Sequence, residues 1–252
     1  MWNVYFKTLE LEDLEGTMYI DLEQLIRNLE PLERGNKTLG IIKCGEHRDS
    51  TSYIKSIEKK AKDLDIKTIL VDLENAESLY QKIMEIQDLS NAILPVRPFP
   101  ELVEIFLKIN ILSSKDIDNF TSKSIFQNCI SEGVLEILKF LGVGTDKHVL
   151  VVGRGIGKVI AKELLRNDFT IMVAHSKTRN LELLTRNADV IISATGVKGL
   201  IKKDMVKVNS IVIDVGLGDV ERGVEEKADV TPVKNGVGAV TTQILFKHLL
   251  EL

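Results

Sequence analysis

Cysteine is scarce in this sequence. Only Cys44 and Cys129 occur among 252 residues, and neither stands in a C-x-x-C pair. This spacing disfavours a disulfide framework and a zinc site, so we expect free thiols and no bound metal. The four histidines are scattered and point to no metal centre either.

An excess of basic residues and long apolar runs are missing as well. The net charge of −4 gives no basic footprint for nucleic acid. No apolar run approaches the roughly 18 to 20 residues of a membrane span. Acidic residues interrupt residues 1–16 before the apolar core of a signal peptide forms. We therefore expect a cytoplasmic protein with neither a nucleic acid nor a membrane as partner.

Apolar and helical patterns alternate along the rest of the chain. Hydrophobic residues make up 44% of it, enough for the core of one large domain or two modest ones. The patterns predict strands over 39–45, 68–71, 91–94, 149–152, 170–174, 190–194 and 211–215. They predict helices over 22–29, 50–64, 79–86, 101–110, 132–140, 159–165, 181–186 and 241–252. This alternation is typical of an α/β fold.

A glycine turn between an apolar strand and a helix is the most informative motif. The turn is Gly153, Arg154, Gly155, Ile156 and Gly157. Its glycines let the backbone approach a pyrophosphate, and the free N–H groups at a helix start favour the anion. The third glycine stands one position earlier than G-x-G-x-x-G requires, and a merely structural turn is the alternative. The strand and helix around it favour a dinucleotide site in a Rossmann-like sheet.

The end of the next predicted strand favours NADP over NAD. NAD sites usually place a carboxylate there, whereas this chain continues with His175, Ser176, Lys177 and, further on, Arg179. Arg154 in the glycine turn adds a guanidinium that suits a 2′-phosphate. The alternative is that Lys177 and Arg179 are ordinary solvated loop charges.

Several longer motifs occur in the order found in one enzyme family. They are HSKTRNL (175–181), NADVIISATG (187–196), IVIDVG (211–216) and TPVKNGVGAVT (231–241). Through them the second half resembles the methylenetetrahydrofolate dehydrogenase/cyclohydrolase family, the FolD type. The first half agrees more faintly, in Ser50 and Tyr53, in the proline-rich segment 95–100, in KDIDN (115–119) and in Cys129.

The resemblance implies two α/β domains that flank a cleft, the second Rossmann-like, and a homodimer. It implies a tetrahydrofolate-type substrate in the cleft and NADP on the second domain. On this basis we predict a folate-binding domain over 1–127, closed by helix 241–252, and an NADP-binding domain over 128–240. The resemblance adds further cofactor-binding residues: Thr195, Gly196, Asp214, Gly216, Gly236, Gly238 and Thr241.

The predicted folate site departs from the family pattern. Family members carry Tyr-x-x-x-Lys on the first helix; here Tyr53 is present, but the lysine position is Ile57, which cannot move a proton. Lys60, two turns from Tyr53, is the only local substitute. Asp118 matches the aspartate that binds the pterin, so Tyr53 and Asp118 are the predicted catalytic residues. The family glutamine is replaced by Val96.

Hydride transfer needs no acid or base side chain, because the cofactor itself accepts the hydride and the protein only positions the two reactants. The sequence therefore predicts an NADP-dependent methylenetetrahydrofolate dehydrogenase with weak or absent cyclohydrolase activity. Two alternatives stay open: a reductase of another substrate in a more apolar cleft, and a non-catalytic relative that binds NADP or folate.

Overall fold

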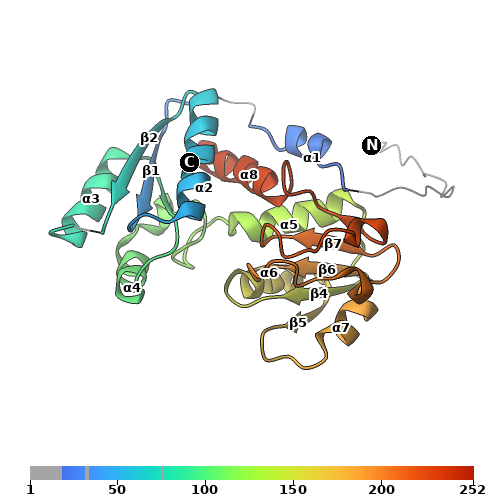
Figure 1. Ribbon diagram of the computed structural model, residues 1–252. Coiled ribbons are helices and arrows are strands. Elements are labelled where there is room, and N and C mark those ends of the chain that lie inside the picture. The colour runs from blue at the N-terminus through green and yellow to red at the C-terminus, as the bar shows by residue number, and fades with distance from the viewer. Residues whose placement is uncertain (1–18, 32–33, 75) are drawn as a thin grey trace.

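The computed structural model describes residues 19–31, 34–74 and 76–252. The start of the chain, on which the signal-peptide interpretation rests, lies outside these residues. Strands and helices alternate as the sequence predicts, and the α/β class is confirmed (Figure 1). The strands are β1 (Thr38–Lys43), β2 (Lys67–Asp72), β3 (Ala92–Pro95), β4 (His148–Val152), β5 (Thr170–Ala174), β6 (Val190–Ser193), β7 (Ile211–Asp214) and β8 (Asp229–Val230).

Most of the helices lie between successive strands. They are α1 (Glu23–Asn28), α2 (Arg48–Asp63), α3 (Leu79–Leu89), α4 (Glu101–Asn110), α5 (Cys129–Phe140), α6 (Gly155–Arg166), α7 (Leu181–Asn187) and α8 (Val237–Glu251). Short 3₁₀ turns occupy Ser113–Lys115, Lys203–Met205 and Val224–Glu226. None of the helices in the described residues is long and apolar enough to cross a membrane.

The first sheet is parallel and has the order β2-β1-β3. Side chains alternate along β1, so that Ile41 packs toward α2 whereas Ile42 packs toward α3 and α4. Gly40 lets α3 approach closely, because a Cβ at this position would lie 2.8 Å from Ile86 Cγ1. Both faces of this sheet are therefore covered, as parallel sheets require.

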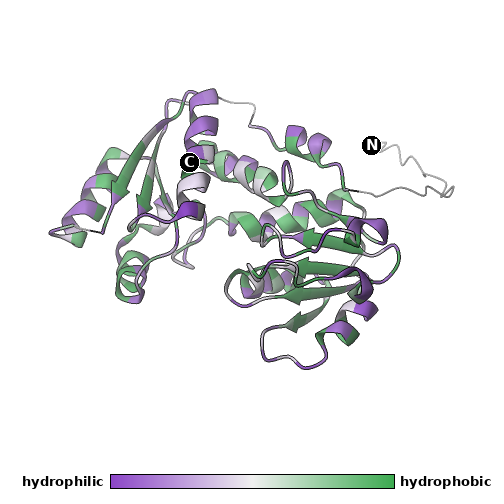
Figure 2. Cartoon of the chain, viewed as in Figure 1, coloured by the Kyte–Doolittle hydropathy of each residue, from purple (hydrophilic) through white to green (hydrophobic). Residues whose placement is uncertain are grey.

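The second sheet is also parallel and has the order β5-β4-β6-β7-β8. Its central strands are buried on both faces: Val151 packs toward α5 and α6, and Leu150 packs into a separate cluster with Leu181 and Leu184 of α7. Apolar residues fill the strands of both sheets, and polar residues mark the outer helix faces (Figure 2). The chain leaves β4 toward β5 on one side and later returns to β6 on the other. That reversal opens a crevice at the carboxyl ends of these strands.

Helices α5 and α8 join the two sheets into one molecule. They lie side by side between the sheets, and the largest core cluster runs from Leu39 in the first sheet to Ile192 in the second (Figure 1). Gly133 on α5 permits this contact, since a Cβ there would lie 3.3 Å from Thr241 Oγ1 on α8. The N–H of Ile20 donates to the Val230 carbonyl (2.8 Å), so the start of the described chain lies on the edge of the second sheet.

Four helices begin two to four residues before their predicted starts. Helix α6 begins at Gly155, four residues early, inside the glycine turn. Helix α5 begins three residues early because the Asn128 side chain accepts from the N–H groups of Ile130 and Ser131, both at 3.2 Å. Helix α8 begins at Val237, four residues early, directly after Gly236. Helix α2 begins at Arg48, two residues before the predicted start.

Candidate functional site

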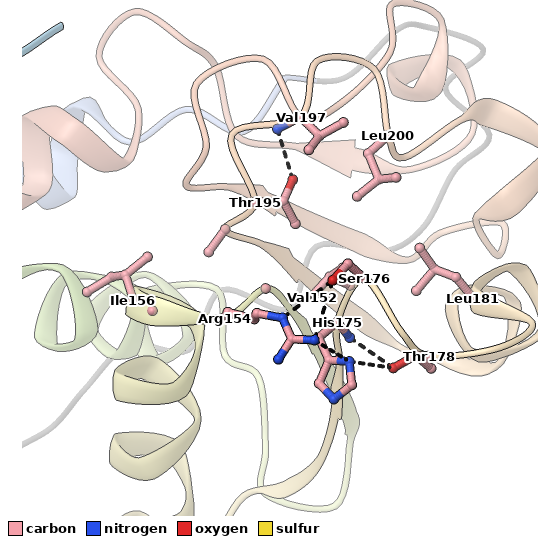
Figure 3. A pocket seen from close by; sticks show the side chains of 13 residues that line it. Val152, Arg154, Ile156, His175, Ser176, Thr178, Leu181, Thr195, Val197 and Leu200 are labelled. Atoms are coloured by element: carbon pink, nitrogen blue, oxygen red, sulfur yellow. Dashed lines mark hydrogen bonds between the residues drawn. The ribbon is translucent and has the colours of Figure 1, made fainter.

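A cavity of about 570 Å³ opens at the carboxyl ends of β4, β5 and β6 (Figure 3). Its position is the crevice where the strand order reverses, which is where doubly wound sheets bind ligands. Seven residues predicted to bind the cofactor line it: Gly153, Arg154, Gly155, Ile156, His175, Ser176 and Thr195. Val152, Thr178, Leu181, Ala194, Val197 and Leu200 complete the lining.

The glycine turn forms the floor of this cavity. Gly153 has φ 145°, and a Cβ there would lie 2.4 Å from the Ala194 carbonyl oxygen, so no other residue fits without a backbone shift. Gly155, with φ 35°, starts α6 and aims the helix N-terminus at the cavity. Gly157 lies one turn into α6 and packs against Val151, where a Cβ would meet ordinary contact at 3.6 Å. The third glycine thus serves helix packing and does not line the cavity.

Polar groups gather where the glycine turn meets the end of β5. The Arg154 guanidinium lies 3.4 Å from Ser176 Oγ and 3.5 Å from His175 Nδ1 (Figure 3). The N–H of Lys177 donates to the same ring nitrogen at 3.3 Å, while the lysine side chain is exposed. No carboxylate is among the cavity-lining residues that the structure describes. This corner therefore presents a guanidinium and a hydroxyl to an anion.

Asp219 organises the far wall and was missed by the sequence analysis. Its carboxylate is fully buried and accepts from the Thr195 N–H (2.7 Å), the Thr195 hydroxyl (2.8 Å) and the Ser193 hydroxyl (2.7 Å). It thereby fixes the loop after β6, whose Thr195 in turn accepts from the Val197 N–H (3.1 Å). Only its place after β7 could have signalled this role, since loops after neighbouring parallel strands meet at one sheet edge.

Two predicted residues, one at the end of β7 and one just after it, support this wall from behind. Asp214 accepts from the Gly218 N–H at 2.8 Å, and burial raises the pKa of its carboxyl. Gly216 lies against Asp219, where a Cβ would come within 2.2 Å of a carboxylate oxygen. Neither residue lines the cavity.

The remaining predicted cofactor residues also lie outside the cavity lining. Gly196, with φ 69°, sits in the loop between Thr195 and Val197. Gly236 precedes α8 and leaves no room for a side chain, because a Cβ would lie 1.7 Å from the Pro232 carbonyl oxygen. Gly238 is in the first turn of α8, and Thr241 is buried in that helix, where its hydroxyl donates to the Val237 carbonyl.

A second, larger cavity of about 890 Å³ lies between α4, the segment 119–128 and α6. It shares Gly155 and Ile156 with the nucleotide cavity. A ligand in this cleft would therefore meet a nucleotide at the glycine turn. The cleft wall also includes Arg97, whose guanidinium lies 4.5 Å from the Phe120 ring centroid and 3.0 Å from Glu104.

Tyr53 and Asp118 lie near each other, but neither lines this cleft; Asp118 adjoins it through Asn119 and Asn128, which do. Asp118 accepts from the Cys129 N–H (2.8 Å) and from Asn128 Nδ2 (3.1 Å). Burial, together with the Asp116 charge, raises the pKa of Asp118 to about 6, although the hydrogen bonds from Cys129 and the Arg97 charge oppose the shift. Burial, with the nearby Asp118 carboxylate, also raises the pKa of the Tyr53 phenol well above its ordinary value. The fold thus joins residues that are far apart in the sequence.

Ile57, at the family lysine position, and Lys60, the suggested substitute, both have other contacts in the structure. Ile57 is 0% exposed and packs in the shared core beside Tyr53, and Val96 packs in the same cluster. Lys60 Nζ lies 2.6 Å from Glu30, so the structure gives this lysine a partner in the segment after α1. Within the described ranges, no group of three or more His, Cys, Asp or Glu side chains is placed to hold a metal ion.

Comparison of the sequence with known proteins shows which family shares these features. Residues 128–252 match the family model described as tetrahydrofolate dehydrogenase/cyclohydrolase, NAD(P)-binding domain. The bifunctional protein FolD of Thermosipho africanus is 39% identical over 223 residues, which cover 79% of this chain and 82% of that protein. FolD of Thermotoga petrophila is 36% identical over 268 aligned positions, which cover 93% of this chain and 97% of the relative.

Solved structures agree with the sequence comparison. The N5,N10-methylenetetrahydrofolate dehydrogenase-cyclohydrolase of Trypanosoma brucei, solved with NADP cofactor and an inhibitor, has a TM-score of 0.82 and 26% identity to this chain. The match covers 93% of this chain and 96% of that one. These comparisons confirm the resemblance drawn from the sequence motifs. The chain belongs to the tetrahydrofolate dehydrogenase/cyclohydrolase family of enzymes.

Proposed function

We propose that this protein oxidises 5,10-methylenetetrahydrofolate to methenyltetrahydrofolate with NADP and hydrolyses the product poorly or not at all. The observation that carries the proposal is the junction at Gly155 and Ile156, which line both the nucleotide cavity and the cleft. The wall of that cleft includes Asn128, the hydrogen-bond partner of Asp118. Bound NADP would accept the hydride, so the chain needs only to hold the substrate carbon against it.

The corner around Arg154 supports the choice of NADP. A guanidinium, the Ser176 hydroxyl and the Lys177 N–H are grouped where a 2′-phosphate would sit. The absence of a carboxylate among the described lining residues removes the partner that NAD would need for its ribose hydroxyls. The N–H groups at the start of α6 would take the pyrophosphate.

Tyr53 and Asp118 would bind the pterin end of the substrate. An ionised Asp118 would accept a hydrogen bond from the pterin amino group, and the Tyr53 ring would pack against the bicycle. Since the pKa of Asp118 is about 6, this carboxylate is ionised at neutral pH. The raised pKa of Tyr53 keeps its phenol protonated, so it can donate a hydrogen bond but cannot serve as a base at neutral pH.

Hydrolysis of the methenyl product needs a group that moves a proton to or from water. Ile57 has no such group and is packed in the core, and Lys60 is paired with Glu30. Among the described residues, Arg97 is the cation whose charge lowers the pKa of Asp118. Its guanidinium stays protonated and is a poor acid or base. These three observations support a dehydrogenase with little cyclohydrolase activity.

We also propose the predicted division into a folate-binding part (1–127 with 241–252) and an NADP-binding part (128–240). The start of the matched family model at residue 128 supports the first boundary. The same model runs on to residue 252, and α8 is buried against α5. Helix α8 therefore belongs to the packing of both parts, and cutting the chain at residue 240 would remove core residues.

A homodimer in the cytoplasm completes the proposal. Strand β5 is the edge of the second sheet, and its exposed Val173, with Ile171 and Leu165, lines a shallow apolar hollow of about 450 Å³. A second copy of the chain would cover this edge. Val173→Lys should then shift the molecular mass in sedimentation from dimer to monomer, whereas an unchanged mass would remove this face from the interface.

The experiment that tests the activity is a turnover assay with methylenetetrahydrofolate and each nucleotide. We expect reduced nucleotide to form with NADP and to form much more slowly with NAD. Turnover of neither nucleotide, with NADP binding intact, would overturn the folate assignment and favour a reductase of another substrate or a binding protein.

A further inference from the structure

A buried histidine lies behind the substrate end of the cleft and has no part in the proposed chemistry. His248, on α8, is 3% exposed. Its Nδ1 lies 2.8 Å from the Ile117 carbonyl oxygen, and its Nε2 lies 3.0 Å from Glu132 Oε2 on α5. The ring therefore links three segments: the C-terminal helix, α5 and the segment that carries Asp118.

The contacts of the ring define its charge. A carbonyl oxygen can only accept a hydrogen bond, and an ionised carboxylate can only accept as well. Both ring nitrogens must therefore donate, which requires the doubly protonated imidazolium. The hydrogen bond and charge of Glu132 raise the pKa of His248 despite its burial, and His248 lowers the pKa of Glu132 in turn.

Cys129 lies nearby, and a Cys-His-Glu arrangement is one that activates a thiol nucleophile in other enzymes. Its sulfur is 3.6 Å from His248 Nδ1, but that nitrogen already donates to Ile117. The thiol itself donates to the Ile117 carbonyl at 3.4 Å and is 1% exposed, and burial raises its pKa well above the ordinary value. The sulfur is therefore an inert part of the packing.

The imidazolium also supports two parts of the cleft wall. The Phe126 ring stacks on it with centroids 4.4 Å apart and an interplanar angle of 22°, and Phe126 lines the cleft. The Cys129 N–H, next to the sulfur that His248 contacts, donates to the Asp118 carboxylate. We propose that His248 is a positioning residue, a buried imidazolium that holds the segment bearing Asp118 in place at the substrate end of the cleft.

Titratable groups surround His248 and its direct partners. Glu132 on α5 and Glu251 on α8 act on the ring itself, Lys139 and Lys247 act on Glu132, and Asp116 and Asp118 act on Cys129. Of these, Glu132 alone makes a direct charged contact with the ring. His248 acts on the position of Asp118 through Ile117 and Cys129. This inference rests on the proposed function only where substrate binding is measured.

The first test needs no turnover. In the full chain labelled with ¹³C-histidine, we expect the His248 ring, identified by its loss in His248→Gln, to stay protonated above about pH 6.5, the ordinary value for histidine. His47, His148 and His175 give the other three ring signals. A neutral His248 ring at that pH would overturn the proposal.

The second test separates positioning from mere stabilisation. We expect His248→Gln to lower the pKa of Asp118, followed by carboxyl ¹³C shifts, because a loosened segment admits water. We expect it to raise the KM for methylenetetrahydrofolate about tenfold and to leave the KM for NADP within about twofold. Ile244→Val, a buried change on the same helix near Gly133, should change neither the pKa of Asp118 nor the KM for methylenetetrahydrofolate.

Equal effects of the two variants on Asp118 would contradict positioning and leave His248 a simple packing residue. Because both NMR readouts are independent of catalysis, an inactive wild-type protein would overturn the proposed function without deciding against His248. An unchanged Asp118 titration in His248→Gln would overturn the positioning role even in a fully active enzyme.

Discussion

The two cavities are built in different ways. The nucleotide cavity takes its floor from one continuous segment, residues 153–156, and its polar corner from residues directly after β5. The cleft has Arg97, after β3, in its wall. The Arg97 charge acts on Asp118 before α5, and the Asp118 charge acts on Tyr53 of α2. A local motif therefore determines the first site, whereas the second depends on how helices and loops pack.

Gly153→Val should have the largest effect. Its Cβ would meet the Ala194 carbonyl at 2.4 Å in a backbone conformation that valine rarely adopts, so we expect NADP affinity to fall more than about a hundredfold. Gly157→Ala is the matched control, since its Cβ meets only ordinary contact. Titration of the protein with NADPH by fluorescence measures both. Similar affinities for the two variants would show that the turn does not define the site.

Ile57→Lys tests whether the family lysine can simply be restored. The side chain is 0% exposed in the shared core, so a buried ammonium should lower the free energy of unfolding by about 3 kcal/mol or more. Ile57→Met, which keeps the volume, should cost less than about 1.5 kcal/mol. Urea unfolding compares them. A lysine variant as stable as the methionine one would mean that position 57 can open to the cleft.

Asp118→Asn should weaken folate binding without affecting the nucleotide. The amide oxygen can still accept from Cys129 and Asn128, so the fold should hold, but the charged acceptor is lost. We expect the KM for methylenetetrahydrofolate to rise about thirtyfold. Because the wild-type pKa is about 6, the wild-type KM should also rise as pH falls below that value, and the variant should lose this dependence. A parallel pH dependence in both proteins would exclude Asp118 as its source.

Arg154→Gln should change the choice of nucleotide more than binding in general. Loss of a guanidinium from a 2′-phosphate site should raise the Kd for NADP about tenfold and leave the Kd for NAD within about twofold. Lys177→Gln is a useful comparison, because that side chain is exposed and should contribute less. Calorimetric titration with both nucleotides gives the four constants. Equal losses for NADP and NAD would place the 2′-phosphate elsewhere.

The His248–Glu132 pair should give the smallest effect, a pH dependence of stability. The pKa of His248 is raised on folding, so its contribution is complete below about pH 6.5 and is lost as pH rises through the folded value. We expect the free energy of unfolding to fall by about 1 kcal/mol as the pH rises through the folded pKa of His248, and we expect no such fall in Glu132→Gln. Thermal unfolding at several pH values measures it. A stability that rises with pH in this window would contradict the charged ring.

Most of the fold and the nucleotide site could be predicted from sequence, for a physical reason. Strands such as Ile211–Asp214 and the glycine turn are encoded by residues close together in the chain. Asp219 could not be found this way, because its partners Ser193 and Thr195 belong to a different loop and meet it only at the sheet edge. The burial of Ile57 and the Glu30 partner of Lys60 likewise depend on packing that periodicity does not reveal.

The central claim is that the first half supports hydride transfer but has lost the group that hydrolyses the product. The most direct measurement follows reduced nucleotide and methenyltetrahydrofolate at separate wavelengths in one reaction with methylenetetrahydrofolate and NADP. We predict that both rise together in equal amounts. Reduced nucleotide that rises while methenyltetrahydrofolate stays low would contradict the claim, because another group would then be hydrolysing the product.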